Sequence, residues 1–283
     1  MLNIIRADMY RIMRGKALYI TLAVLLVLNL IMIISLNAFQ TGAMDVDQAS
    51  GIGVGIEIGV QDEAALAAAM EELQAINLNG VHVPNLLAAS MENLVWFLLP
   101  IIVVVAAAIF SHGTVKNDIA WGICRVKLYF SKLLLSSALS VVLLIFYIGS
   151  GMLIATIING FGGPAPAGHW VNLLQVLGAQ LFMLIAMVSI GVFLTFTTKR
   201  TAAVNGIFIA FALAPPLIIS LLEFANPNFS RLFNFDMLSN IMRLANLHYL
   251  TTRELMYAFG LGAFYLLATT IGGIVLFRRT EIK

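Results

Sequence analysis

The residues best suited to chemistry or recognition gather in one polar segment, 111–132, which reads SHGTVKNDIAWGICRVKLYFSK. Its basic side chains outnumber its carboxylates four to one: Lys116, Arg125, Lys127 and Lys132 against Asp118. Long apolar runs flank it, at 91–110 and 133–158. A basic connector between two such runs is typical of the cytoplasmic side of a membrane protein. Its helical pattern predicts a structured element on which a cytoplasmic component pushes.

Motifs for self-contained chemistry are absent from the sequence. There is no H-E-x-x-H zinc pair, and no set of Ser, His and Asp groups within the apolar runs. No G-x-x-x-x-G-K-[ST] nucleotide loop occurs, since the one Gly-Lys pair, Gly15-Lys16, lacks a preceding glycine loop. Cys124 stands alone, which excludes an internal disulfide or a cysteine-based metal site. His169 and His248 are interpreted as interfacial polar residues, so we expect no metal, no bound cofactor and no enzyme activity in the chain itself.

Composition indicates an all-α integral membrane protein. Of 283 residues 61% are hydrophobic and 11% are charged, whereas soluble domains carry about 25% charged residues. Runs of about 20 apolar residues predict six spans, at 17–39, 94–111, 133–158, 172–197, 202–223 and 255–277. The first run is too long for the core of a cleaved signal peptide, about 7–15 residues. We predict one transmembrane domain over 1–283.

The basic residues predict the orientation. Of the 16 Lys and Arg residues, 13 precede the first span, follow the last, or lie between spans two and three or four and five. The loop 40–93 has none. By the positive-inside rule both termini are cytoplasmic.

An amphipathic helix is predicted before the first span, over 1–16. Its apolar residues share one side: Leu2, Ile5, Met9, Ile12 and Met13. Arg11 and Arg14 fall on the other side, which we expect near anionic lipid headgroups. The helix is either a simple anchor or an elbow helix packed on the bundle.

Two outer segments are expected. In 40–93 a glycine-rich run at 51–59 is too permissive for a firm strand, and 62–76 favours a short helix. The acids of this loop indicate either a vestibule for cationic substrates or only the usual outer depletion of Lys and Arg. The segment 224–254 follows Pro215-Pro216, which should break or kink the fifth span. One or two short outer helices are expected there.

Ionisable residues are missing from the interiors of the predicted spans, which argues against a transporter driven by an ion gradient. The strongly polar residues there are amides: Asn29, Asn37, Gln175, Gln180 and Asn205. We interpret these amides as interhelical hydrogen-bonding groups, with a substrate path across Asn29 and Asn205, between spans one and five, as the alternative. The work must then come from a partner, unless the protein is passive or structural.

Two helical interpretations of the polar segment are possible. In a single helix, one narrow face holds Ile119, Ile123, Val126 and Phe130, and the other side holds Trp121, Cys124 and Leu128. Gly122 instead favours a short helix at 115–121, with the third span beginning near Arg125. We expect the second arrangement, with Trp121 as an exposed interface anchor. A basic loop that only sets topology remains the alternative.

At these residues the chain resembles the membrane subunits of bacterial ABC exporters of the type 2 class, which have the type V fold. The family connector reads G-T-h-K-N, then G-h-x-R-x-K-h-Y-h-x-K, where h is apolar. The matching residues here are Gly113, Thr114, Val115, Lys116 and Asn117, then Gly122, Ile123, Arg125, Lys127, Leu128, Tyr129 and Lys132. The ending is also similar, with Phe277, Arg278, Arg279 and Glu281. Cys124 stands where family members often have Ser or Thr.

The resemblance implies a half-transporter in a bacterial cytoplasmic membrane. It pairs with a second copy or a related permease and with two cytoplasmic ATPase subunits, which bind ATP and Mg²⁺; no nucleic acid is involved. The implied ATPase-coupling residues are Lys116, Asn117, Ile119, Trp121, Gly122 and Arg125. In style the chain is most similar to Gram-positive exporters of antimicrobial or toxin peptides, such as the phenol-soluble modulin exporter. Drug or lipid export, or a non-transport scaffold or sensor, are the alternatives.

Overall fold

The computed structural model describes residues 2–41, 77–111, 113–245 and 251–279, and in these ranges it is helical. Six helical runs are long and apolar enough to cross a membrane. They are α2 (Lys16–Gln40), the run α6 (Glu92–Ile102), η1 (Val103–Ala107) and α7 (Ala108–Ser111), then α9 (Arg125–Asn159), α10 (His169–Thr198), α11 (Thr201–Ala225) and α13 (Thr252–Arg279). The six predicted spans are confirmed.

The bundle is built around α10, which packs on α13, α9, α11 and α6. It is the most buried of the spanning helices, in keeping with an apolar character all round its surface. Small residues allow this close packing: a Cβ added to Gly191 would lie 2.4 Å from the Ile102 side chain, and one added to Gly262 would lie 2.8 Å from Phe182.

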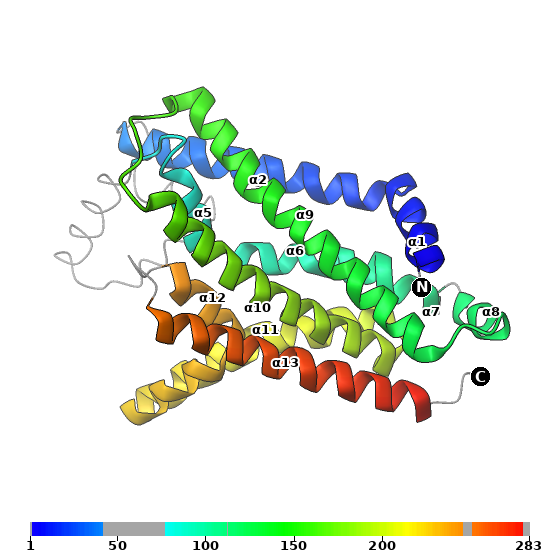
Figure 1. Cartoon of the computed structure of the whole chain (residues 1–283). Coiled ribbons are helices and arrows are strands. Elements are labelled where there is room, and N and C mark those ends of the chain that lie inside the picture. The colour runs from blue at the N-terminus through cyan, green and yellow to red at the C-terminus, as the bar shows by residue number, and fades with distance from the viewer. Residues whose placement is uncertain (1, 42–76, 112, 246–250, 280–283) are drawn as a thin grey trace.

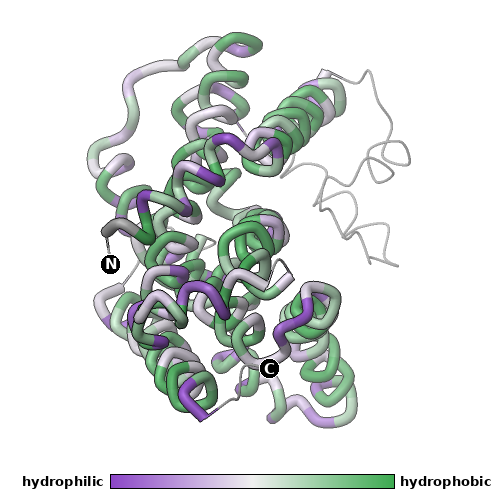
Figure 2. The backbone as a smooth tube through the Cα atoms, turned by 90° about the vertical axis from the view of Figure 1, so that its right-hand side faces the viewer, coloured by the Kyte–Doolittle hydropathy of each residue, from purple (hydrophilic) through white to green (hydrophobic). Residues whose placement is uncertain are grey.

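One end of the bundle gathers the basic connectors. Both chain ends, the short helix α8 (Thr114–Ala120) and the α10–α11 junction at Lys199 and Arg200 lie together there (Figure 1). Figure 2 views the molecule from this side, with both termini toward the reader. We call it the basic end. Its position in the cytoplasm stays a prediction from the charge rule.

Within the ranges that the structure describes, the opposite end carries three short helices. Two of them, η2 (Pro227–Phe235) and α12 (Met237–Ala245), confirm the short helices predicted between spans five and six. The third, α5 (Val83–Ala89), was not predicted. The chain before α5 pairs with the end of α9, where the Gly80 and Val81 amides donate to the carbonyls of residues 160 and 161. The glycine-rich run at 51–59 and the helix predicted at 62–76 lie outside the described residues.

The fifth span corrects one expectation. α11 continues through Pro215 and Pro216 as one helix, so the break allowed by the proline pair is absent. Proline removes a backbone donor without forcing a helix to end, and spanning helices tolerate it where neighbouring groups can adjust.

Candidate interaction site at the basic end

α8 is a separate short helix whose two ends are set by glycines. Gly113, with φ of 67°, precedes it, and Gly122, with φ of 78°, follows it. At its end the Gly122 amide donates to the Ile119 carbonyl at 2.9 Å, and the Ile123 amide donates to the Asp118 carbonyl at 3.1 Å. This pair of bonds is a Schellman motif, which favours glycine at its left-handed position. The split at Gly122 is confirmed, and the single-helix interpretation is wrong.

The two sides of α8 differ in polarity. Val115 is buried, and Ile119 packs against the bundle core together with Ile123. Lys116 and Asn117 are exposed. Trp121 is 87% exposed, so its large indole surface lies open to solvent or a partner. α8 therefore has one face fixed to the bundle and one face free in the single chain.

The start of α9 turns other predicted residues inward. Leu128, predicted beside Trp121 on the outer side, is fully buried, while Phe130, predicted beside Ile119, is 39% exposed. The reason is the turn at Gly122, after which α9 begins its own helical register at Arg125.

Arg125 ties α9 to the end of the last span. Its Nη1 donates to the Phe277 carbonyl at 3.1 Å and to the Arg278 carbonyl at 2.8 Å. Its guanidinium also lies over the Phe277 ring, 5.9 Å from the ring centre. The last carbonyls of a helix lack intrahelical donors, and a cation there is favourable. These contacts hold α9 on α13, and the coupling contact that the resemblance implies for Arg125 stays a prediction.

An aromatic cluster joins four helices next to this contact. Phe110 of α7 meets Phe196 of α10 with ring centres 5.3 Å apart, and Phe196 meets Phe277 of α13 at 4.8 Å. Tyr129 of α9 packs on Phe196 at 4.9 Å. Edge-to-face packing of this kind adds stability beyond area burial. The bundle next to α8 is therefore tightly joined.

Cys124 is the exposed cap residue at the start of α9. The backbone N–H groups of Val126 and Lys127 lower the pKa of its thiol below the ordinary value. These amides belong to the first turn of α9, where donors have no intrahelical acceptor. The thiol is thus a natural labelling position next to α8.

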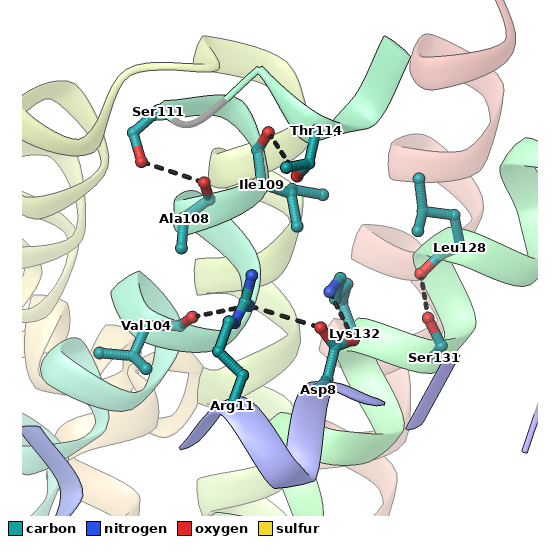
Figure 3. A network of polar contacts seen from close by, with 10 residues as sticks. All are labelled: Asp8, Arg11, Val104, Ala108, Ile109, Ser111, Thr114, Leu128, Ser131 and Lys132. Carbon is teal, nitrogen blue, oxygen red and sulfur yellow. Dashed lines mark hydrogen bonds and ion pairs between the residues drawn. The ribbon is translucent and has the colours of Figure 1, made fainter. Parts of the chain in front are cut away.

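Buried charges beneath α8 were not predicted (Figure 3). Lys132 is 1% exposed, and its Nζ contacts Asp8 Oδ2 at 2.5 Å. Asp8 belongs to α1 (Leu2–Arg14) and also pairs with Arg11, whose Nη2 lies 3.4 Å from Asp8 Oδ1. Arg11 Nη2 donates to the Val104 carbonyl at 3.3 Å. We call Asp8, Arg11 and Lys132, together with the Val104 carbonyl, the charged cluster.

The charged cluster corrects two expectations. Arg11 faces the bundle through Asp8 and Val104, although it was placed on the headgroup side of the helix. Lys132 is a buried ion-pair member at the start of a spanning helix, although it was counted as an exposed connector charge. Asp8 carried the missing signal, since its spacing from Ile5 and Ile12 places a carboxylate on the apolar side of α1.

Three of the predicted amides form bonds between helices. Asn29 Nδ2 of α2 donates to the Tyr147 carbonyl and to Ser150 Oγ of α9, both at 2.9 Å. Asn37 Nδ2, also of α2, donates to the side-chain oxygen of residue 159 in α9 at 2.9 Å. Gln180 Nε2 of α10 donates to the carbonyl of residue 88 in α5 at 2.8 Å and of residue 241 in α12 at 3.0 Å. For Asn29, Asn37 and Gln180 the interhelical role is confirmed.

The predicted substrate path finds no support within the chain. Asn29 is buried against α9, whereas Asn205 lies on α11, and its buried Oδ1 has no hydrogen-bond partner among the described residues. α2 packs on α9, α1 and α6, while α11 packs on η2, α10 and α12. The path between spans one and five stays a prediction.

At the opposite end a cavity of about 880 Å³ lies between α12 and α13. Its described lining mixes charges of both signs, with Arg243 and Arg253 beside Glu254. Across the ranges that the structure describes, no group of three or more His, Cys, Asp or Glu residues is placed to hold a metal ion.

No protein-family model matches this chain, and no curated protein matches it either.

Proposed function

We propose that this chain is the membrane subunit of an ATP-driven exporter and that α8 receives a cytoplasmic ATP-binding subunit. The observation that carries the proposal is α8 itself, with the exposed indole of Trp121 at its C-terminal cap and with Val115 buried against the bundle. A large aromatic residue on a free helical face is the kind of anchor that dominates protein interfaces.

The energy source argues for the same partner. The sequence has no nucleotide-binding loop, so ATP hydrolysis belongs to another subunit. α8 lies between the second span, which ends in α7, and the third, α9, and its Val115 is buried in the bundle. A push on the free face of α8 therefore reaches two spans directly.

The assembly we propose holds two membrane subunits, identical or related, and two ATPase subunits in a bacterial cytoplasmic membrane. Large apolar side chains are exposed along α2 and α11 of the single chain, as expected for helices that face lipid or a second subunit. The proposed substrates are hydrophobic or amphipathic peptides, toxins or antimicrobial peptides.

The first experiment tests the interface. A candidate ATP-binding subunit is co-expressed and co-purified with wild-type protein, Trp121→Ala and Gly122→Pro, and its ATP hydrolysis is measured. Proline cannot adopt the positive φ of Gly122 and loses the amide that closes α8. A lost anchor of this kind costs about 2 kcal/mol or more, so we expect recovery of the ATPase to fall by about thirty-fold.

Trp170→Ala is the matched control, because Trp170 lies at the far end, at the start of α10, and is 39% exposed. It should leave co-purification unchanged. If the wild-type chain binds no ATPase, or Trp121→Ala and Gly122→Pro bind as well as Trp170→Ala, the proposal fails and a scaffold or sensor role becomes the better account.

The second experiment tests the substrate class. Growth is measured in a panel of cationic helical peptides, in cells with the chain and its ATPase and in cells with a catalytically dead ATPase. Protection that needs hydrolysis supports peptide export. Protection against hydrophobic drugs or lipids alone would assign the same machinery to those substrates.

A further inference from the structure

The N-terminal helix α1 contacts the elements on both sides of α8. Lys132 lies on α9, the helix that follows α8, and Val104 lies in η1, which leads into α7 before α8. Asp8 forms an ion pair with Lys132, and Arg11 donates a hydrogen bond to the Val104 carbonyl. Two side chains one turn apart on α1 thus bridge the two spans that hold α8 (Figure 3).

The contact on the second span falls at an irregular turn. η1 is π-helical, and the amide of Ala108 donates back to the carbonyl of Val103, five residues earlier. Such turns insert one residue into a helix and are frequent at functional sites. The guanidinium of Arg11 supplies a side-chain donor to the Val104 carbonyl within this turn.

The contact on the third span is buried. Lys132 is 1% exposed, and its Nζ lies 2.5 Å from Asp8 Oδ2. A buried ammonium that loses its nearest carboxylate is costly, so Lys132 resists any movement of α9 away from α1.

We propose that Asp8, Arg11 and Lys132 are positioning residues that make α1 a strut across the two spans flanking α8. The inference rests on the proposed function and deepens it. α1, η1, α7 and α9 move as one body when the ATPase pushes α8, because the buried Asp8–Lys132 pair and the half-buried bond from Arg11 to Val104 keep their spacing fixed. α1 then carries the movement into α2, which is separated from α1 by the single residue Gly15.

The test separates binding from coupling. In Asp8→Asn the anchor Trp121 is untouched, so the ATPase should co-purify as with the wild-type chain. Peptide-stimulated hydrolysis should fall by a factor of about 2 to 30, the range for contacts that carry coupling between sites. Arg6→Gln is the matched control, because Arg6 lies on the exposed side of α1 and has no place in the charged cluster.

A double variant distinguishes positioning from mere stability. Asp8→Leu with Lys132→Met removes both charges, so no buried ion is left alone and folding should recover. The ion pair between α1 and α9 is still absent in this variant, so peptide should still fail to stimulate ATP hydrolysis. Recovery of coupling in this double variant would overturn the proposal, because it would show that the pair acts only on stability.

A partner-free measurement keeps the inference independent of transport. A spin label on Cys124, the chain's one cysteine, reports the mobility of the α8–α9 junction in lipid vesicles. Mobility should rise in Asp8→Asn and in the double variant and stay at the wild-type level in Arg6→Gln. Unchanged mobility in the double variant overturns the strut. If the label becomes more mobile in Asp8→Asn and in the double variant but the wild-type chain binds no ATPase, the mechanical link stands. Its role in coupling is then overturned.

Discussion

Removal of Asp8 should destabilise this protein more than removal of its partner Lys132. Lys132 is 1% exposed, and in Asp8→Asn its ammonium stays buried beside Arg11 with only the weaker attraction of Asp118. Breaking a buried pair from one side costs about 3–5 kcal/mol. The reverse change, Lys132→Met, leaves Asp8 with a second cation 3.4 Å away and a side chain that is 11% exposed. Its expected cost is about 1–2 kcal/mol, near the lower range for a buried group that loses one partner.

The assay is a double-mutant cycle read from apparent unfolding midpoints in one detergent. Four proteins are compared at the same protein concentration: the wild type, Asp8→Asn, Lys132→Met, and the double variant that combines Asp8→Asn with Lys132→Met. The double variant should be more stable than Asp8→Asn alone, because methionine removes the unpaired ammonium and fills a similar volume. Equal and additive losses, or a larger loss for Lys132→Met, would refute the argument, since either result means that Lys132 reaches water.

Three further predictions follow from local geometry. Gly122→Val should destabilise the α8 turn by about 1–2 kcal/mol through backbone strain alone, because no atom lies within 4 Å of the added Cβ. Gly122→Asn should cost less stability, and the unfolding midpoints of the two variants test this difference. Gln180→Leu should cost about 1.2 kcal/mol, at about 0.6 for each of its two interhelical bonds, and should loosen α5 and α12 in hydrogen exchange. Alkylation of Cys124 should slow as pH falls through the thiol pKa, with a midpoint below the ordinary thiol value in the folded chain and a return toward the ordinary value after denaturation.

Hydropathy and turn chemistry predict most of this fold. Runs of about 20 apolar residues identify the spans because the bilayer sets their length. Gly122 predicts the end of α8 because a Schellman motif needs a left-handed residue. These signals are local, so a single sequence contains them.

The missed features depend on residues far apart in the chain. Lys132 reads as a connector charge until Asp8, 124 positions away, is placed beside it. The bond from Arg125 to the end of α13 joins residues 152 positions apart. α5 has seven residues, too few for a periodic pattern, and it packs on α9 and α12 and accepts a hydrogen bond from the amide of Gln180. In each case the deciding contact is tertiary, and neither composition nor spacing records it.

The central claim is that the free face of α8 receives an ATP-binding subunit. The most direct test replaces Trp121 with a photo-cross-linking amino acid in cells that also produce the candidate ATPase subunit, with the same replacement at Trp170 as the control. We predict a light-dependent cross-link to the ATPase from position 121 and none from position 170. An absent cross-link at 121, or equal cross-linking at both positions, would contradict the claim.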